Sequence, residues 1–355
     1  MGANRKKRLL FIASLPTKKM NFDGERNKSR DVLNAFKKMG EFKITIIDLS
    51  KNKCLQIIKM MLCFMFCKYS SVFVSKCIVG GSLAIHLLNK IRKKQNVVFY
   101  IIGNGYYGFD DKKIYFEDIN RCNRLIVESD IVKESMISKG FISNKIDVFP
   151  CLKPEYNLDF TKHVYKRCQP LKLIYFSRIN PDKGLGDLIN VIVDINSNYN
   201  TPILTLDISG GVSNEPGIKE FNEYVVEQCC KYEYLNYLGM SLRIDGIESY
   251  KILQRYDLHV FPSHFKQECA PGAIFDMFVA GVPTLSSKFP SYKYLLTEDN
   301  SYLFEQCDNN DLKNKLIFIY KNAYKELNEK RYRTFLERLK YTDKAFIRLL
   351  EGMNL

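Results

Sequence analysis

The chain has 355 residues, of which 46% are hydrophobic and 26% are charged. This composition excludes a disordered or fibrous chain, and the length suits two domains, since domains average roughly 100–200 residues. The net charge is +15, and residues 1–154 alone carry 29 basic against 13 acidic residues, or +16, which indicates an anionic partner: nucleic acid, a phosphorylated substrate or an acidic membrane face.

Strand and helix patterns alternate along the first half of the chain, as in βαβ units. The expected strands are 8–14, 43–49, 70–74, 96–102, 124–128 and 145–149. The expected helices are 29–39, 54–67, 82–94 and one between the last two strands, with a polar loop at 18–27 before the first helix. These elements predict a Rossmann-like domain at 1–152.

The segment Pro150–Pro154 interrupts this pattern and is the expected linker. The alternation then resumes, with strands expected at 171–176, 203–209, 234–238, 258–261 and 284–286. Helices are expected at 185–196, 218–232, 247–254, 273–279, 311–327 and 331–350. A second Rossmann-like domain is therefore predicted at 153–330, and two such domains imply a ligand cleft outside the carboxyl ends of both sheets.

The cysteines and the apolar segments indicate a cytoplasmic protein. Eleven cysteines and four histidines are scattered without the spacing of a metal site, which suits reduced, buried thiols. The most apolar stretch, Cys54–Cys67, is 14 residues long and contains Lys59, whereas a transmembrane helix needs roughly 20 residues. The basic start of the chain lacks the cleavage site of a secretory signal.

The segment Ser177–Gly184 follows an expected strand and precedes an expected helix. Its Arg178 and Lys183 are spaced so that two cations and helix-end N–H groups can meet one phosphate cluster, although two ordinary surface cations are an equal alternative. Gly210 and Gly211 end the next strand. Glycines there allow a ligand to approach the backbone, but they also suit an ordinary turn.

The strongest pattern lies between Tyr256 and Pro283. Glu268 is in a loop, and Asp276 lies eight residues later, two turns into a helix. The Pro271-Gly272 pair between them leaves backbone N–H groups at a helix N-terminus available to a phosphate. Acids at both ends of such a turn suit hydrogen bonds to sugar or ribose hydroxyls, although either acid alone is more commonly a cap or a solvated side chain.

Taken together, these motifs resemble those of the retaining GT-B glycosyltransferases of family four, over nearly the whole chain. The matching residues are Ser177, Arg178, Lys183 and Gly184 in the family's G-R-x…K-G loop, and Glu268, Asp276 and Ala280–Pro283 in its E-x7-E element and following turn. Gly103–Tyr107 resembles a segment of members that build bacterial capsules and exopolysaccharides. The resemblance implies two Rossmann-like domains facing a central cleft, with the C-terminal helix, about 331–355, crossing back to the N-terminal domain.

The resemblance also implies a role for each site residue. Arg178 and Lys183 would hold the donor diphosphate. Glu268 would contact hydroxyls of the donor sugar, and Asp276 would form a hydrogen bond with the ribose. The backbone of Pro271, Gly272, Ala273 and Ile274 would complete the phosphate cradle, and Gly24 would let its loop approach the diphosphate. Gly210 and Gly211, singled out above by their place at a strand end, complete the predicted donor site. Three positions depart from the family pattern: Ser177 replaces Gly, Asp276 is shorter than Glu, and His86 falls in an expected helix and is interpreted as structural.

The implied activity is the transfer of a sugar from a UDP- or GDP-type nucleotide-sugar to a glycan or an undecaprenyl-diphosphate-linked saccharide, in polysaccharide biosynthesis. No metal or other cofactor is expected, because two cations and a helix end can stabilise the departing diphosphate, and Asp110-Asp111 is interpreted as solvated. The basic N-terminal half and Cys54–Cys67 would face the anionic inner side of the plasma membrane. A buried helix with lysines at its ends is the competing interpretation of Cys54–Cys67.

Other functions stay open at this point. A nucleotide-sugar epimerase shares the two-domain architecture but would carry more acids and histidines in the cleft. A nucleic-acid-binding protein would explain the charge but not the two domains, and no zinc-finger, RRM or KH pattern is present. A module that binds a nucleotide-sugar without turnover is a third alternative, against which Arg178, Lys183 and Glu268 argue.

Overall fold

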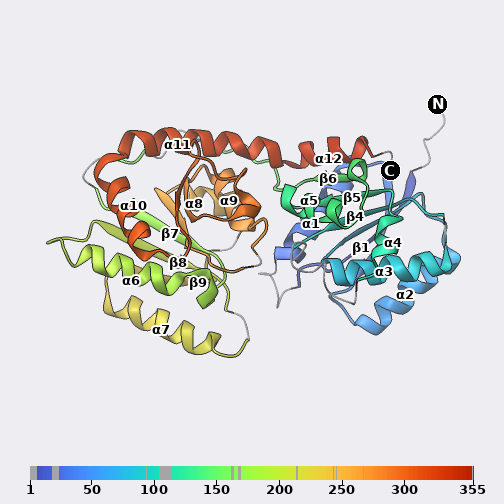
Figure 1. Cartoon of the computed structure of the whole chain (residues 1–355), viewed down its shortest axis with the longest axis horizontal. Coiled ribbons are helices and arrows are strands. Elements are labelled where there is room, and N and C mark those ends of the chain that lie inside the picture. The colour runs from blue at the N-terminus through green and yellow to red at the C-terminus, as the bar shows by residue number, and fades with distance from the viewer. Residues whose placement is uncertain are drawn as a thin grey trace. The chain divides into compact units, whose positions relative to one another are not determined.

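The chain divides into two compact units in the computed structural model (Figure 1). Unit 1 comprises Met1–Glu155, Gln267–Ala270 and Lys340–Leu355, and unit 2 comprises Tyr156–Lys266 and Pro271–Leu339. The structure describes residues 6–17, 24–92, 94–103, 114–160, 164–166, 169–212, 215–242, 244, 246–266, 268–353 and 355. None of the helices in these ranges is both long enough and apolar enough to cross a bilayer.

Unit 1 contains a six-stranded parallel sheet in the order β2-β1-β3-β4-β5-β6. Its strands are β1 (Lys7–Ala13), β2 (Phe42–Asp48), β3 (Ser71–Lys76), β4 (Val97–Ile101), β5 (Arg124–Val127) and β6 (Ile146–Val148). Successive side chains of a strand point to opposite faces, and β1 accordingly supplies Leu9 and Phe11 to one core cluster and Leu10 and Ile12 to another. This two-sided burial explains why the strands are continuously apolar, as the sequence predicted.

The helices of unit 1 are α1 (Gly24–Met39), α2 (Lys53–Phe66), α3 (Ile78–Ile91), α4 (Phe116–Asn120), α5 (Asp130–Ser138) and α12 (Asp343–Glu351). Phe346 and Leu350 of α12 pack in the same cluster as Phe36 of α1. The prediction that the C-terminal helix returns to the first domain is therefore confirmed. The predicted start of the first helix at residue 29 is wrong, because α1 begins at Gly24.

Unit 2 contains a second six-stranded parallel sheet in the order β12-β11-β10-β7-β8-β9. Its strands are β7 (Leu171–Phe176), β8 (Leu204–Ser209), β9 (Leu235–Gly239), β10 (Leu258–Phe261), β11 (Thr284–Ser287) and β12 (Ser301–Phe304). The sequence did not predict β12, a short edge strand that pairs with β11 alone among the described strands.

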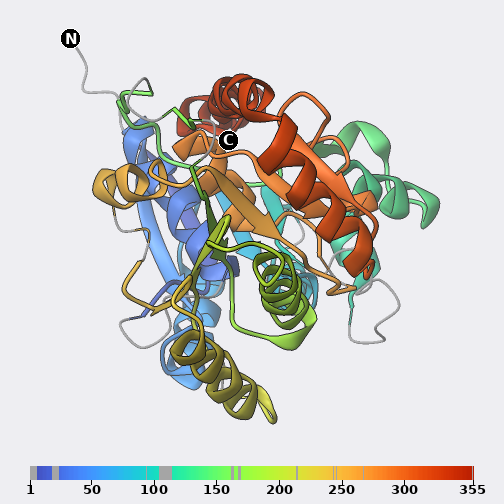
Figure 2. The same cartoon turned by 90° about the vertical axis from the view of Figure 1, so that its left-hand side faces the viewer.

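The helices of unit 2 are α6 (Leu185–Asn196), α7 (Ile218–Lys231), α8 (Ile247–Leu253), α9 (Gly272–Ala280), α10 (Asn309–Asn322) and α11 (Tyr324–Glu337). Helix α7 lies beside α6 (Figure 2). Between these helices, the Tyr224 hydroxyl donates to Asn190 Oδ1 at 3.2 Å. Two predicted helices, 311–327 and 331–350, are wrong in their extent. The chain breaks at Ala323, and after α11 it passes through a 3-10 turn, Arg338–Tyr341, before the Thr342 side chain caps the backbone N–H of Ala345 and starts α12.

Candidate functional site

The carboxyl edge of the unit 2 sheet has the topology of a ligand site. Strand β7 lies between β8 and β10. The chain adds β8 and β9 on one side of β7 and then adds β10, β11 and β12 on the other side. In open parallel sheets, ligands bind outside the carboxyl ends of the strands at such a switch point. The loops that begin at Ser177 and at Pro262 flank this point.

These two loops touch each other closely. Gly184 has φ +70°, and a Cβ there would lie 2.1 Å from the Pro262 carbonyl oxygen, so only glycine fits. The His264 backbone N–H donates to the Asp182 carbonyl at 3.0 Å. The Gly of the predicted K-G pair therefore allows the loop after β7 to pack against the loop after β10.

The two predicted cations have different surroundings. The side chain of Lys183 is buried, and its Nζ lies 4.4 Å from the centre of the Phe265 ring, a cation–π distance. Arg178 is exposed, and among the residues that the structure describes its guanidinium has no ion-pair partner. The Tyr175 hydroxyl donates to the Arg178 carbonyl at 2.7 Å and so holds the backbone of the loop. An exposed guanidinium on a held backbone suits a phosphate ligand.

Gly210 joins the ends of β7 and β8. The Ile179 N–H donates to the Gly211 carbonyl at 3.0 Å, and a Cβ at position 210 would lie 1.8 Å from the Ser177 carbonyl oxygen. The close approach of two backbones therefore requires this glycine without any ligand. The donor-binding role of Gly210 and Gly211 stays a prediction.

The loop after β10 leads to α9, whose first turn carries no acidic side chain and whose N-cap, Pro271, makes no side-chain cap bond. Gly272 and Ala273 are half-buried, and Ile274 is buried with its N–H directed to the Pro271 carbonyl at 3.1 Å. Asp276 is buried within α9 and accepts a hydrogen bond of 2.9 Å from the Tyr250 hydroxyl. This acid is thus neither a cap nor a solvated side chain.

Two predicted site residues lie in unit 1 instead. Glu268 is half-buried and belongs to the segment that groups with unit 1. Gly24, predicted in a loop, is the exposed first residue of α1, and a Cβ there would meet open space. No close approach requires a glycine at that position among the described atoms.

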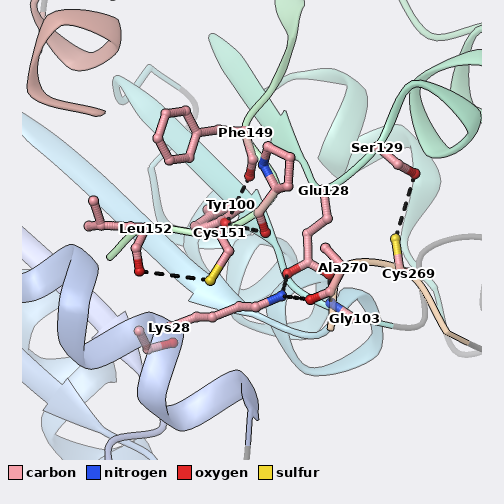
Figure 3. Close-up of polar contacts among 12 residues, drawn as sticks. Lys28, Tyr100, Gly103, Glu128, Ser129, Phe149, Cys151, Leu152, Cys269 and Ala270 are labelled. Carbon is pink, nitrogen blue, oxygen red and sulfur yellow. Dashed lines mark hydrogen bonds and ion pairs between the residues drawn. The ribbon is translucent and has the colours of Figure 1, made fainter. Parts of the chain in front are cut away.

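A buried ion pair at the carboxyl edge of the unit 1 sheet was not predicted (Figure 3). Lys28 of α1 is paired with Glu128, which follows β5, and the two side chains are 8% and 2% exposed. Lys28 Nζ also donates to the Ala270 carbonyl at 2.8 Å, and the Gly103 N–H donates to Glu128 Oε2 at 2.8 Å. A sequence signal existed for the acid alone, since Glu128 directly follows an apolar strand.

Electrostatics couple the two members of this pair. Burial by itself lowers the pKa of Lys28, but the charge and hydrogen bond of Glu128 outweigh it and leave the pKa above its usual value. Burial raises the pKa of Glu128, against the opposing effects of Lys28 and the Gly103 N–H. Each charge therefore depends on its partner for its stability inside the protein.

His86 lies in α3, as predicted, where its Nδ1 is 2.6 Å from Asp118 Oδ2 and its ring stacks on Tyr115. Within the described ranges, no three or more His, Cys, Asp or Glu side chains are grouped to hold a metal ion. The Asp110-Asp111 pair lies outside the described residues.

A protein-family model matches the part of the chain that contains the loop after β7. The family model described as "Glycosyl transferases group 1" matches residues 161–334. The matched residues are just under half of the 355-residue chain. This segment contains Arg178, Lys183, Asp276 and the N-terminus of α9. None of the curated protein sequences matches the chain.

Several solved structures share the fold of this chain over nearly its whole length. HepE from Anabaena, solved with UDP and glucose, has 13% identity and a TM-score of 0.70, with 98% of this chain and 99% of that chain covered. The lipopolysaccharide outer core galactosyltransferase WaaB has 14% identity and a TM-score of 0.69, with 98% of each chain covered. Sucrose-phosphate synthase from Thermosynechococcus elongatus has 13% identity and a TM-score of 0.63, covering 98% and 100%. This likeness confirms the predicted GT-B fold class.

Proposed function

We propose that this protein transfers a sugar from a nucleotide-sugar donor to a saccharide acceptor with retention of the anomeric configuration. The observation that carries the proposal is the held loop after β7, which carries the exposed Arg178 and the buried Lys183 and follows a switch-point strand. This loop lies in the stretch that matches the group 1 glycosyltransferase model. The resemblance of the Arg178, Lys183, Glu268 and Asp276 motifs to those of retaining family-four enzymes supports the stereochemistry.

In the proposed reaction, Arg178 and Lys183 bind the donor diphosphate, together with the N–H groups at the start of α9. The bond between the anomeric carbon and the donor phosphate oxygen breaks, and the acceptor oxygen forms the new bond on the same face. The acceptor proton passes to a donor phosphate oxygen. Negative charge grows on the departing diphosphate, and fixed cations and helix N–H groups stabilise it without reorganisation.

The two acids orient the donor in this scheme. Glu268 hydrogen-bonds hydroxyls of the donor sugar, and Asp276 hydrogen-bonds the ribose. The Tyr250 hydroxyl holds one oxygen of Asp276, which fixes the direction of the carboxylate. The positive charge that the departing diphosphate needs comes from Arg178, Lys183 and the helix end, so the scheme uses no metal ion.

We test UDP-sugars first, because HepE was solved with UDP-glucose, and GDP-sugars second. The proposed acceptor is a glycan or an undecaprenyl-diphosphate-linked saccharide, in the synthesis of a polysaccharide such as a capsule or exopolysaccharide. Such an acceptor is presented at the inner face of the plasma membrane, and helix α2 offers a surface for it.

Helix α2 is apolar on two sides. Met60, Cys63 and Phe64 are buried in the core of unit 1. The apolar side chains of the other side follow a helical spacing and are exposed by 61%, 55%, 47% and 77%, respectively, for Leu55, Ile58, Leu62 and Phe66. The interpretation of this segment as a buried helix is therefore right for one side only.

We propose that the exposed side of α2 contacts an anionic membrane surface. Lys53, Lys59 and Lys68 are exposed at or beside this helix, and each basic group near an anionic surface contributes about 1 kcal/mol. The protein should sediment with anionic vesicles, be released by salt and ignore zwitterionic vesicles. Phe66→Glu should weaken sedimentation, whereas Phe318→Glu, at an exposed position of α10, should not. Equal binding of both variants would remove the proposal.

The catalytic proposal is tested with UDP- and GDP-sugars, following nucleotide release and the thermal midpoint. A nucleotide diphosphate at 100 times its Kd should add about 2.7 kcal/mol to the unfolding free energy. Arg178→Ala and Lys183→Ala should abolish this stabilisation and the release of nucleotide. Lys172→Ala, an exposed lysine at the amino end of β7, is the matched control and should keep both.

Three outcomes would contradict this function. Full turnover in Arg178→Ala would remove the role of the guanidinium. An isomerised nucleotide-sugar as the product would favour an epimerase. Preferential binding of DNA with a steep salt dependence would favour a nucleic-acid-binding protein.

A further inference from the structure

Residues 268–270 group with unit 1, although the chain before and after this short segment groups with unit 2. Two of the contacts that hold the segment, both between described residues, lie within two residues of Glu268 in the sequence. Lys28 Nζ donates to the Ala270 carbonyl at 2.8 Å (Figure 3). The Cys269 side chain is buried in a core cluster of unit 1, with its Sγ 3.6 Å from the Ser129 Oγ.

The ammonium of Lys28 has a fixed place because its partner is fixed. Glu128 is pinned by the Gly103 N–H at 2.8 Å on one oxygen and by Lys28 on the other. Both side chains are almost fully buried. The Ala270 carbonyl therefore accepts from an ammonium whose position is restricted, whereas a lysine on the surface can adopt many rotamers.

Stability alone does not account for this pair. Burying two charges is costly, and well-packed apolar residues in the place of a buried ion pair are commonly as stable or more stable. Apolar residues, however, have no donor for the Ala270 carbonyl. The property that only the charged pair supplies is thus the hold on the segment that follows Glu268.

We propose that Lys28 and Glu128 are positioning residues for Glu268. Lys28 fixes the backbone two residues after Glu268, Cys269 fixes the residue between them, and the carboxylate of Glu268 is thereby confined. The link to catalysis rests on the proposed function, in which Glu268 contacts the donor sugar. The hold on the segment itself does not depend on that function.

The buried thiol of Cys269 reports on this hold directly. Burial is the main cause that raises the pKa of Cys269 to about 12, and it also raises that of Cys122, in the same unit, to about 12. In the double variant K28M/E128Q, alkylation of Cys269 by N-ethylmaleimide, mapped by mass spectrometry, should be at least about tenfold faster, while Cys122 stays slow. A tenfold change corresponds to about 1.4 kcal/mol in the free energy of opening.

A matched control variant tests whether the faster alkylation of Cys269 is specific to the loss of the Lys28–Glu128 pair. R124M/D147N removes another ion pair of β5, formed at its amino end, and should leave the alkylation of Cys269 unchanged. Unchanged labelling of Cys269 in K28M/E128Q overturns the proposal. Equal acceleration of Cys269 and Cys122 also overturns it, because the pair would then stabilise the whole unit.

Kinetics test the link to Glu268. In K28M/E128Q, kcat for sugar transfer should fall at least about tenfold, while the Kd for UDP stays within about twofold, since Arg178 and Lys183 are unaltered. Faster labelling with unchanged kcat would overturn the link to Glu268. If the unaltered protein transfers no sugar, the proposed function fails, and the labelling experiment still decides whether the pair holds the segment.

Discussion

The carboxyl edges of the two sheets place their cations in opposite ways. In unit 1, Lys28 is buried and paired with Glu128, and the pair binds its own chain at Ala270. In unit 2, Arg178 is exposed, and no described acid pairs with it. Both sheets have six parallel strands, although their strand orders differ. The cation of unit 1 holds a segment of its own chain, and the cation of unit 2 is the one that we propose to bind a ligand.

Removing Lys28 alone should have the largest effect on stability. Lys28→Met leaves Glu128 buried without its charge partner, which should cost about 3–5 kcal/mol in the free energy of unfolding. K28M/E128Q removes both charges and should cost clearly less. Urea denaturation measures both variants, and a double variant at least as damaging as Lys28→Met would contradict the pairing.

The edge of unit 2 depends on glycines rather than on an ion pair. Gly210→Ala places a Cβ against the Ser177 carbonyl oxygen, so it should cost about 1–3 kcal/mol and weaken nucleotide binding by displacing the Arg178 loop. Gly186→Ala, in α6, is the control, because its Cβ would lie 3.5 Å from Phe221 of α7, an ordinary van der Waals contact. Chemical denaturation with and without UDP compares them, and equal effects of both substitutions would refute the close approach.

Acid should destabilise unit 2 through the protonation of His259 in β10. Complete burial lowers its pKa to about 3, while the unfolded chain has the ordinary value near 6.5. As the pH falls below about 6.5, His259 becomes protonated in the unfolded state but stays neutral in the folded state. The unfolding free energy therefore falls by up to about 1.4 kcal/mol per pH unit. His259→Gln should remove this part of the acid dependence between pH 6.5 and 4. Identical slopes in both proteins would show that another group is responsible.

The smallest effect is expected at Arg178. In the absence of nucleotide, Arg178→Ala should change the unfolding free energy by less than about 0.5 kcal/mol, because an exposed guanidinium with no ion pair to a described residue contributes little to the fold. The same denaturation assay, without ligand, checks this value. A loss similar to that of Lys28→Met would mean that the two edges are alike after all.

Local patterns made most strands and the loop after β7 predictable. Each strand is a short apolar run, and Arg178 and Lys183 lie within one loop, so their spacing can be seen in the sequence. The strand β12 and the breaks at Ala323 and Arg338–Tyr341 were missed because a short edge strand and a one-turn interruption leave weak periodic signals.

The Lys28–Glu128 pair was missed for a different reason. Its members lie 100 residues apart, and the carbonyl that Lys28 binds is a further 142 residues along the chain from Glu128. Such a contact exists only once the sheet has brought the end of β5 to α1. The sequence predicted Glu268 from its motif but contained no local sign of what holds the residues after it.

Unit 1 is not a continuous piece of the chain, because Phe346, Leu350, Met353 and Leu355 complete the cluster that contains Phe11 of β1. During synthesis, residues 1–155 are made first, but the core of unit 1 cannot be completed until residues 340–355 have been made. A fragment cut at residue 155 would expose the apolar surface that α12 covers and should aggregate. A soluble version of unit 1 would need residues 340–355 supplied again, joined to the fragment or added as a peptide.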